Sequence, residues 1–476
     1  MLKKGILNKL LVIFFQGISL LILPLIAKYF GNKAYGIWSI IYGIMQMMVP
    51  LLILQLDGAF TRFLSGNKSI VVNRNRYFSI VILLLIVILF MVLVGIIFNK
   101  NISFFMFASN RYTDFVYITL IWISLRVLIT FNKNYFRTFA KFSIDTRLSI
   151  AQQVSIIVSI FIISLSNKNL YDFFVLILSM ESIILLVSFW LIIKELKFKK
   201  IKIYIPKKYF RYALPLIPVM LLSWIINYSD QIMIVHNLSL EDNARYSLYY
   251  TFARIPHWIV ITPLHYALLP YLSKLSYKGK NKNKVNAILK HSINISFLII
   301  SIFVIGLIFF EAEILLYIGN QQILSDSIYL IILISLSVFA TAFYQIIYHV
   351  LSLTNKTKYL VYIYALGAIV NIVLNYFMIP IFGIIGAAFA TLISYILVSF
   401  FTWKVSELSF YEVFDKTNLI FIFFMLVISI LIKIIVASNC LLLILFFIGI
   451  IIIYILFLFK CNNYYYQYIL QKVNLK

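Results

Sequence analysis

The chain has 476 residues, of which 63% are hydrophobic and only 12% are charged, whereas a soluble domain is near half apolar and a quarter charged. The apolar residues occur in blocks of about 20, a pattern that excludes a set of water-soluble domains. The formal net charge of +26 comes from short runs of Lys and Arg between these blocks, which is typical of membrane topology and predicts no nucleic-acid partner.

The apolar blocks predict fourteen membrane-spanning helices. Their expected ranges are 8–28, 34–56, 77–98, 114–134, 146–166, 171–194, 210–235, 245–272, 287–316, 327–350, 357–379, 382–403, 417–437 and 441–460. The first block has spanning length and no small-residue cleavage site, so we expect a retained helix there and not a signal peptide. Cys440 and Cys461 lie at opposite ends of the last helix, roughly 30 Å apart, which excludes a disulfide between them.

The distribution of basic residues sets the expected orientation. With the N-terminus placed in the cytoplasm, 32 of the 41 Lys and Arg residues fall in inner segments and six in outer ones. A missed or extra helix would reverse this bias for every later segment. The sequence therefore predicts an all-α polytopic membrane protein with both termini in the cytoplasm.

The strongest break in composition is the basic run from Lys194 to Arg211, after the sixth helix. It predicts an N-terminal six-helix lobe at 1–194, a basic cytoplasmic linker at 195–209, a C-terminal six-helix lobe at 210–404, and two additional helices with a tail at 405–476. The second helix of each lobe starts similarly, with Ala-Tyr-Gly in one and Ala-Arg-Tyr in the other. Six helices per lobe give a parallel repeat with a central cavity between the lobes.

Two stretches of the C-terminal lobe carry distinctive residues. They are Ala213-Leu214-Pro215-Leu216-Ile217-Pro218 with Trp224 and Tyr228-Ser229-Asp230, and then Asn371, Asn375-Tyr376, Gly383, Gly386-Ala387-Ala388 and Thr391. These stretches resemble the seventh, eleventh and twelfth helices of bacterial polysaccharide flippases of the O-antigen or capsule type. That family belongs to the superfamily that also contains multidrug and toxin extrusion transporters and peptidoglycan lipid flippases.

The resemblance implies a flippase that moves polyprenyl-diphosphate-linked oligosaccharide repeat units across the bacterial cytoplasmic membrane by alternating access, for export of cell-surface polysaccharide. The implied partners are the lipid-linked oligosaccharide, membrane lipids, a polysaccharide polymerase with its chain-length machinery, and a coupling cation. The motifs do not encode the identity of the sugar.

Two arginines lie at bilayer depth, where a charged side chain costs a few kcal/mol and usually faces a cavity or a partner. Arg126 lies about 12 residues, or roughly 18 Å, from the outer end of the fourth helix, and Arg254 lies at a similar depth in the eighth. Guanidinium groups stay charged and present a fork of donors that suits phosphate oxygens. We therefore predict that both bind the diphosphate; the alternative is that each pairs with a carboxylate, such as Glu181 or Asp230, and braces the helices.

Further substrate-binding candidates lie close to Arg254 in the predicted bundle. Tyr250 and His257 share a helix face with it, and Asn227 belongs to a polar stripe on the seventh helix. Arg62 lies with Asp57 where the second helix meets the inner surface, as an entry site for the head group or as an ordinary interfacial pair.

Three acidic residues are candidates for gating or coupling. Asp57 is placed at an inner gate, and Asp230, within the flippase-like motif, is a candidate for a coupling cation or for a structural hydrogen-bonding role. Glu181 lies deep enough in the sixth helix to be protonated, paired or in a watery cavity.

Other functions make different demands on the sequence. We predict no metal site, because the histidines lack nearby Cys or carboxylate ligands at metal spacing, no cofactor, and no enzymatic activity. An envelope polymerase or glycosyltransferase usually carries a large outer domain with catalytic acids, which the short outer loops lack. A multidrug exporter of the same superfamily favours deep acids for cationic cargo, and is the other alternative.

Overall fold

The computed structural model describes residues 25–165, 169–197, 201–265, 268, 272, 281–318, 327–354, 356, 358–436 and 440–473, and regular structure in that part of the chain is entirely helical. We define residues 25–196 as the N-terminal half. It contains α2 (Leu25–Phe30), α3 (Asn32–Leu52), α4 (Leu56–Leu64), α5 (Ile70–Ile97), α6 (Asn99–Phe107), the 3-10 turn η1 (Asn110–Tyr112), α7 (Thr113–Thr138), α8 (Phe142–Ser164) and α9 (Leu170–Leu196).

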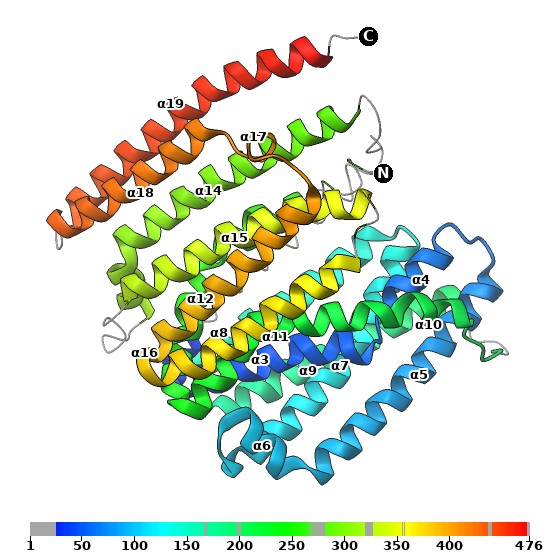
Figure 1. The fold of residues 1–476 in the computed structure, drawn as a ribbon. Helices are drawn as coiled ribbons and strands as arrows, with labels where there is room; N and C mark the ends of the chain where they lie inside the picture. The colour runs from blue at the N-terminus through cyan, green and yellow to red at the C-terminus, as the bar shows by residue number, and fades with distance from the viewer. Residues whose placement is uncertain are drawn as a thin grey trace.

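Residues 207–406 are defined as the C-terminal half, which two further long helices follow. The elements are α10 (Lys207–Ala213), the 3-10 turn η2 (Leu214–Leu216), α11 (Ile217–Asn237), α12 (Leu240–Ala253), the π-helical turn η3 (His257–Ile261), α14 (Asn281–Ile318), α15 (Ser327–Leu353), α16 (Lys358–Ser406), α17 (Phe410–Val413), α18 (Lys416–Val436) and α19 (Cys440–Val473). Figure 1 shows α18 and α19 side by side at one edge of the bundle.

Ten helical segments in the described part are long and apolar enough to cross a bilayer. One of them, α16, has 49 residues and bends sharply at Gly383, whose φ of 58° suits glycine because it has no Cβ. Its two arms (Figure 1) are the predicted helices 357–379 and 382–403. The all-helical, polytopic fold is thus confirmed, while most of the predicted helix 8–28 lies outside the described residues.

Several expected elements differ from the structure. The predicted helix 34–56 ends earlier, at Leu52, because Leu54 and Gln55 adopt left-handed conformations with φ near 55° and separate α3 from α4, which begins at Leu56. The predicted helix 245–272 begins earlier, as α12, and changes to π-helical geometry at His257. Beyond α5, the short helix α6 forms where an irregular connection was expected.

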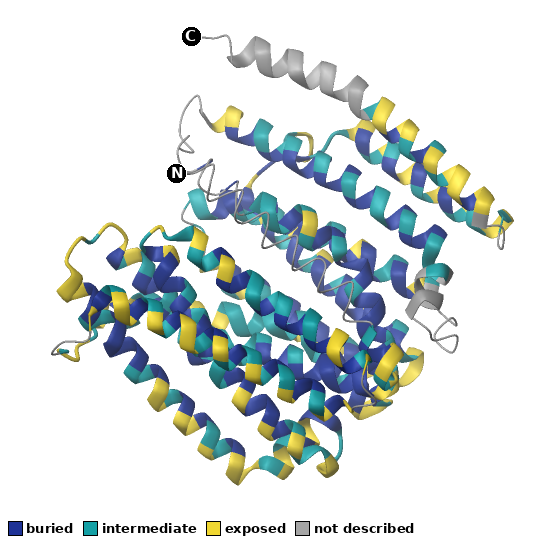
Figure 2. Ribbon diagram, turned by 180° about the vertical axis from the view of Figure 1, so that it is seen from behind, coloured by how far each residue is buried: buried dark blue, intermediate teal, exposed yellow. Residues whose placement is uncertain are grey.

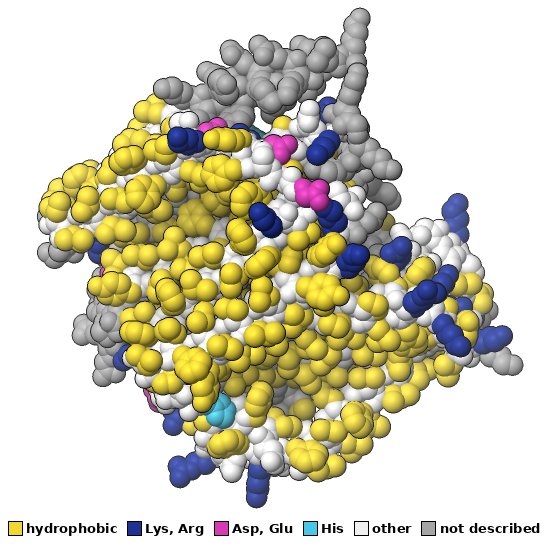
Figure 3. Space-filling view, in the orientation of Figure 1, with side chains coloured by type: hydrophobic (Ala, Val, Ile, Leu, Met, Phe, Trp, Pro, Cys, Tyr) yellow, Lys and Arg dark blue, Asp and Glu magenta, His cyan; other side chains and the backbone are white. Residues whose placement is uncertain are grey.

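The outer surface of the bundle is apolar. Leu89 and Phe90 on α5 are 60% and 69% exposed, and Ile435 on α18 is 80% exposed. Figure 3 shows a broad apolar face with most Lys and Arg side chains at its margins, and Figure 2 shows the buried residues inside the bundle. Only a bilayer solvates such a surface favourably, so the chain is a multi-pass integral membrane protein.

Helix α3 lies at the centre of the molecule because it packs against α7 of its own half and against α11 and α12 of the C-terminal half. Trp38 of α3 is 2% exposed, with its ring centroid 5.1 Å from that of Trp122 on α7. This packing fixes the face of α3 that lines the cavity between the halves.

Candidate substrate-binding cavity

A cavity of about 260 Å³, which we call the central cavity, lies between the two halves. Helix α3 lines it with side chains spaced three and four residues apart, as one helix face requires. The lining residues are Tyr35, Trp38, Ser39 and Tyr42 from α3, Ser223, Asn227, Tyr228 and Gln231 from α11, Ser247, Tyr250, Thr251 and Arg254 from α12 and its end, His257 and Trp258 from η3, and Tyr344 and Gln345 from α15. The lining is aromatic and polar, with one guanidinium.

Arg254 supplies that guanidinium at the point where α12 ends. Its Nη1 donates to Asn227 Oδ1 at 2.6 Å and to the hydroxyl of Tyr250, and the group lies 5.0 Å from the centre of the Tyr250 ring. The Tyr395 hydroxyl also donates to Asn227 Oδ1, at 2.6 Å. These partners are neutral, and Arg254 forms no ion pair with any residue in the described ranges.

Three side chains in the central cavity have polar atoms that either lack a hydrogen-bond partner or can change partners. Arg254 Nε and Gln231 Oε1 are both buried and have no hydrogen-bond partner in the described part of the chain. His257 is 7% exposed, and its Nε2 lies 3.1 Å from the Gln345 amide nitrogen. A buried polar group without a partner is costly, so this arrangement suits a polar ligand.

A second cavity of about 270 Å³, which we call the N-half recess, adjoins the central cavity at Tyr42. Its walls belong to the N-terminal half alone. They are Tyr42, Met45, Gln46, Val49, Pro50 and Ile53 on and just beyond α3, Asp57 on α4, Arg126 and Thr130 on α7, and Gln153 and Ile156 on α8.

Arg126 and Glu181 form an ion pair between α7 and α9. Glu181 is fully buried, and the guanidinium of Arg126 lies 5.5 Å from the ring of Trp122. Pairing with an opposite charge was one of the interpretations of each residue from the sequence, and the structure contains this pair. In this conformation Arg126 lines the N-half recess and Arg254 lines the central cavity.

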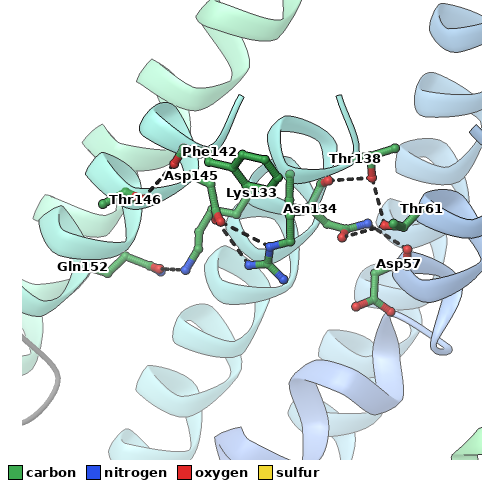
Figure 4. A network of polar contacts seen from close by, with 10 residues as sticks. Asp57, Thr61, Lys133, Asn134, Thr138, Phe142, Asp145, Thr146 and Gln152 are labelled. Atoms are coloured by element: carbon green, nitrogen blue, oxygen red, sulfur yellow. Dashed lines mark hydrogen bonds and ion pairs between the residues drawn. The ribbon is translucent and has the colours of Figure 1, made fainter. Parts of the chain in front are cut away.

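Asp57 and Arg62 lie on the same short helix, but they face different neighbours. Asn134 of α7 donates its amide to the Asp57 backbone oxygen at 2.8 Å, and Thr61 donates to Asn134 Oδ1 at 3.1 Å. Figure 4 shows the Asp57 carboxylate pointing away from these contacts, and the side chain lines the N-half recess. Arg62 lies over the ring of Tyr212 at 4.7 Å and lines neither cavity.

Asp230 lies in a buried network where α11 meets α12 and α16. Its carboxylate accepts hydrogen bonds from the Tyr246 hydroxyl, from Thr391 Oγ1 at 3.2 Å and from the Gln231 backbone N–H at 2.8 Å. Ser229 and Asn375 both donate to Asn371 Oδ1, each at 3.1 Å. Asp230 is fully buried and does not line either cavity.

The structure also adds residues that the sequence did not single out. Gln345 and Tyr344 line the central cavity from α15. Gln345 is an isolated amide in a strongly apolar helix, which is the signal that would have found it. The aromatic residues gave no comparable signal, because 17% of the chain is aromatic.

Comparison with protein-family models places this architecture in a known group. Residues 1–276 match the family described as polysaccharide biosynthesis protein, and residues 215–377 match the MatE family. The chain belongs to the polysaccharide biosynthesis protein family. A comparison of this chain with curated protein sequences found no match.

Solved structures share the fold of this polysaccharide biosynthesis protein. It is similar to a lipid II flippase MurJ in an inward closed conformation, with a TM-score of 0.74 and 18% identity over 94% of this chain and 98% of that one. It is also similar to an inward-facing multidrug resistance MATE family transporter, with a TM-score of 0.66 and 12% identity over 82% of this chain and 93% of that one. A MOP superfamily transporter from Pyrococcus furiosus, described as having a binding pocket of reverse polarity, has a TM-score of 0.60 and 13% identity over 85% of this chain and 96% of that one.

Proposed function

We propose that the chain is a flippase that moves polyprenyl-diphosphate-linked oligosaccharide repeat units across the bacterial cytoplasmic membrane, for export of cell-surface polysaccharide. The family supports a role in polysaccharide biosynthesis, and the fold is the one that flippases and exporters use. Lipid-linked sugar and membrane lipids are the expected partners, with a polysaccharide polymerase and its chain-length machinery acting next.

The observation that carries this proposal is the isolated charge of Arg254. Among the described residues it is the one charged side chain lining the central cavity, and its described partners are neutral groups of Asn227 and Tyr250. Because a guanidinium stays protonated, the cavity has a permanent positive charge that an anionic ligand would offset. A diphosphate supplies that charge together with acceptor oxygens for Arg254 Nε.

Movement of so large a substrate requires the halves to separate. The central cavity, at about 260 Å³, is smaller than the roughly 300–1,000 Å³ of ordinary ligand sites, so a complete repeat unit does not fit this conformation. Alternating access, in which the two halves rock about the central cavity, would supply the space.

For coupling, we propose that a cation binds at Asp230. The carboxylate accepts a hydrogen bond from the Thr391 hydroxyl of α16, and the neighbouring Ser229 donates to Asn371 of α16, which also accepts from Asn375. Asn375 Oδ1 has no hydrogen-bond partner in the described part of the chain. Hard cations bind such oxygen ligands. Because the site joins two helices of the C-terminal half, its occupancy would change how α11 packs.

Multidrug export is the second candidate, favoured by the MatE match and by the fold. Cationic drugs would have to enter a central cavity in which the only charged side chain from the described residues is positive, which favours the anionic cargo instead. An envelope glycosyltransferase is the third, and no group of three or more metal-ligating side chains occurs among the described residues to support metal-assisted catalysis.

The test is translocation of a fluorescent polyprenyl-diphosphate disaccharide in proteoliposomes. We expect wild-type protein to move it and Arg254→Gln to lose at least about tenfold in rate, because the phosphate loses a charge-assisted partner. Arg147→Gln is the matched control, since Arg147 is exposed on α8. Wild-type transport of a lipophilic cation but not of the diphosphate would establish the drug-export function instead.

A further inference from the structure

The N-half recess differs in charge from the central cavity that it adjoins. Arg126 is neutralised by Glu181, whereas Asp57 forms no ion pair with any described residue. Among the described lining residues, the recess therefore has an acidic side chain without an ion-pair partner, whereas the central cavity next to it has a single charged side chain, which is basic. Tyr42 lines both cavities, so its side chain lies at the boundary between the pocket of Arg254 and the pocket of Asp57.

The remaining walls of the recess have the chemistry of a sugar site. Gln46 and Gln153 each present an amide donor and acceptor, Thr130 presents a hydroxyl, and Tyr42 presents an aromatic ring. Met45, Val49 and Pro50 supply apolar contacts for the C–H faces of a ring. Such a set binds hydroxyl groups, which both donate and accept hydrogen bonds.

The Asp57 carboxylate makes this recess selective. An ionised carboxylate only accepts hydrogen bonds, so it binds hydroxyl or ammonium donors and repels a second carboxylate. Like charges placed together discriminate strongly against the wrong ligand. The backbone of Asp57 is held because α4 is joined to α7 through Asn134 and Thr61, and the carboxylate points away from that junction (Figure 4).

We propose that the N-half recess is a glycan subsite that accepts a neutral sugar or an amino sugar and rejects a uronic acid. This inference rests on the proposed function, since the diphosphate at Arg254 is what directs the attached sugar toward Tyr42 and the recess. It assigns to Asp57 a role in choosing the glycan, and to Arg126 with Glu181 the role of shaping the wall.

The experiment compares three polyprenyl-diphosphate disaccharides that differ at one sugar, which is a hexose, a 2-amino hexose or a hexuronic acid. In proteoliposomes, wild type should move the hexose and amino-hexose lipids at least about tenfold faster than the uronic-acid lipid. Asp57→Asn should reduce that ratio to about threefold or less. Asp114→Asn is the matched control, because Asp114 is exposed at the start of α7 and lines neither cavity, and it should keep the wild-type ratio.

Each outcome decides the proposal. Equal wild-type rates for the three lipids, or an unchanged ratio in Asp57→Asn, would overturn the glycan subsite while leaving the flippase function standing. Wild type that moves none of them would overturn both. If Asp57→Asn is monodisperse but moves nothing, its binding of the three lipids in detergent replaces the rates, and retention of the wild-type preference would overturn the subsite.

Discussion

The ion pair of Arg126 with Glu181 provides the sharpest test of the architecture, through the substitution Glu181→Gln. The carboxylate is fully buried and the guanidinium side chain is 13% exposed, so removal of the acid leaves a charge that cannot lose its proton. Breaking a buried pair in this way costs about 3–5 kcal/mol. The partial exposure of Arg126 and its contact with Trp122 place the expected loss near 3 kcal/mol, which is roughly a hundredfold in the folded-to-unfolded ratio.

The matching double variant, Arg126→Met with Glu181→Met, removes both charges and should recover most of that loss, because apolar replacement of a whole buried pair is often neutral. The assay is thermal denaturation in detergent micelles, with the exposed Arg147→Met as the control. The pair would not be buried and mutually compensating if Glu181→Gln were as stable as this control. The same conclusion would follow if the double variant lost as much stability as the two single variants together.

Three further predictions follow from individual contacts. Asn227→Asp should place a carboxylate beside Arg254 and lower translocation of the diphosphate lipid at least about tenfold in proteoliposomes, with little change in melting temperature, because the cavity charge is neutralised. Tyr77→Phe should cost about 1–3 kcal/mol in a denaturation assay, because Asn132, buried between Tyr77 and Ser188, loses the donor to its Oδ1; an unchanged midpoint would contradict this. Asp230→Asn should remove the dependence of transport on an imposed cation gradient while downhill exchange persists, and a full gradient response would exclude the coupling site.

Hydropathy predicted the helices well because the bilayer requires about 20 apolar residues per span and internally satisfied backbone groups. Hydropathy cannot predict where a helix is interrupted when the interruption depends on tertiary packing. Leu54 and Gln55 take left-handed conformations that their residue types disfavour, and Pro50, which lies within the last turn of α3, does not mark where the helix ends. By contrast, the bend in α16 occurs at Gly383, within a motif that the sequence did single out.

The candidate site was predicted in part for a related reason. The cost of burying charge identified Arg126, Glu181 and Arg254 as residues that need partners. Depth alone could not say which partner each would meet, because Arg126 and Glu181 come from helices that neighbour one another only through tertiary packing. The separation of the two arginines into adjoining cavities likewise depends on the position of Tyr42.

The contact between α3 and α12 limits how the halves can move. A Cβ built at Gly36 would lie 2.2 Å from the Leu240 backbone oxygen, and the Gly36 carbonyl accepts the Asn243 amide at 3.3 Å. Any side chain at this position forces the two halves apart, at the end of the bundle that the charge distribution predicts to be outside. Gly36→Ala should therefore disfavour this conformation and raise the labelling of a cysteine introduced at Ser39 by an impermeant thiol reagent from that side.

The linker between the halves indicates where such a movement would occur. Its backbone N–H groups at Lys202 and Tyr204 donate to Asn75 and Ser79 of α5, and α10 packs against α4, with the Tyr209 ring 5.0 Å from that of Phe63. Because residues 201–213 are held by the N-terminal half, we infer that they move with it. The bend would then fall at η2, directly after α10, where Pro215 has no N–H to donate to a continuous helix.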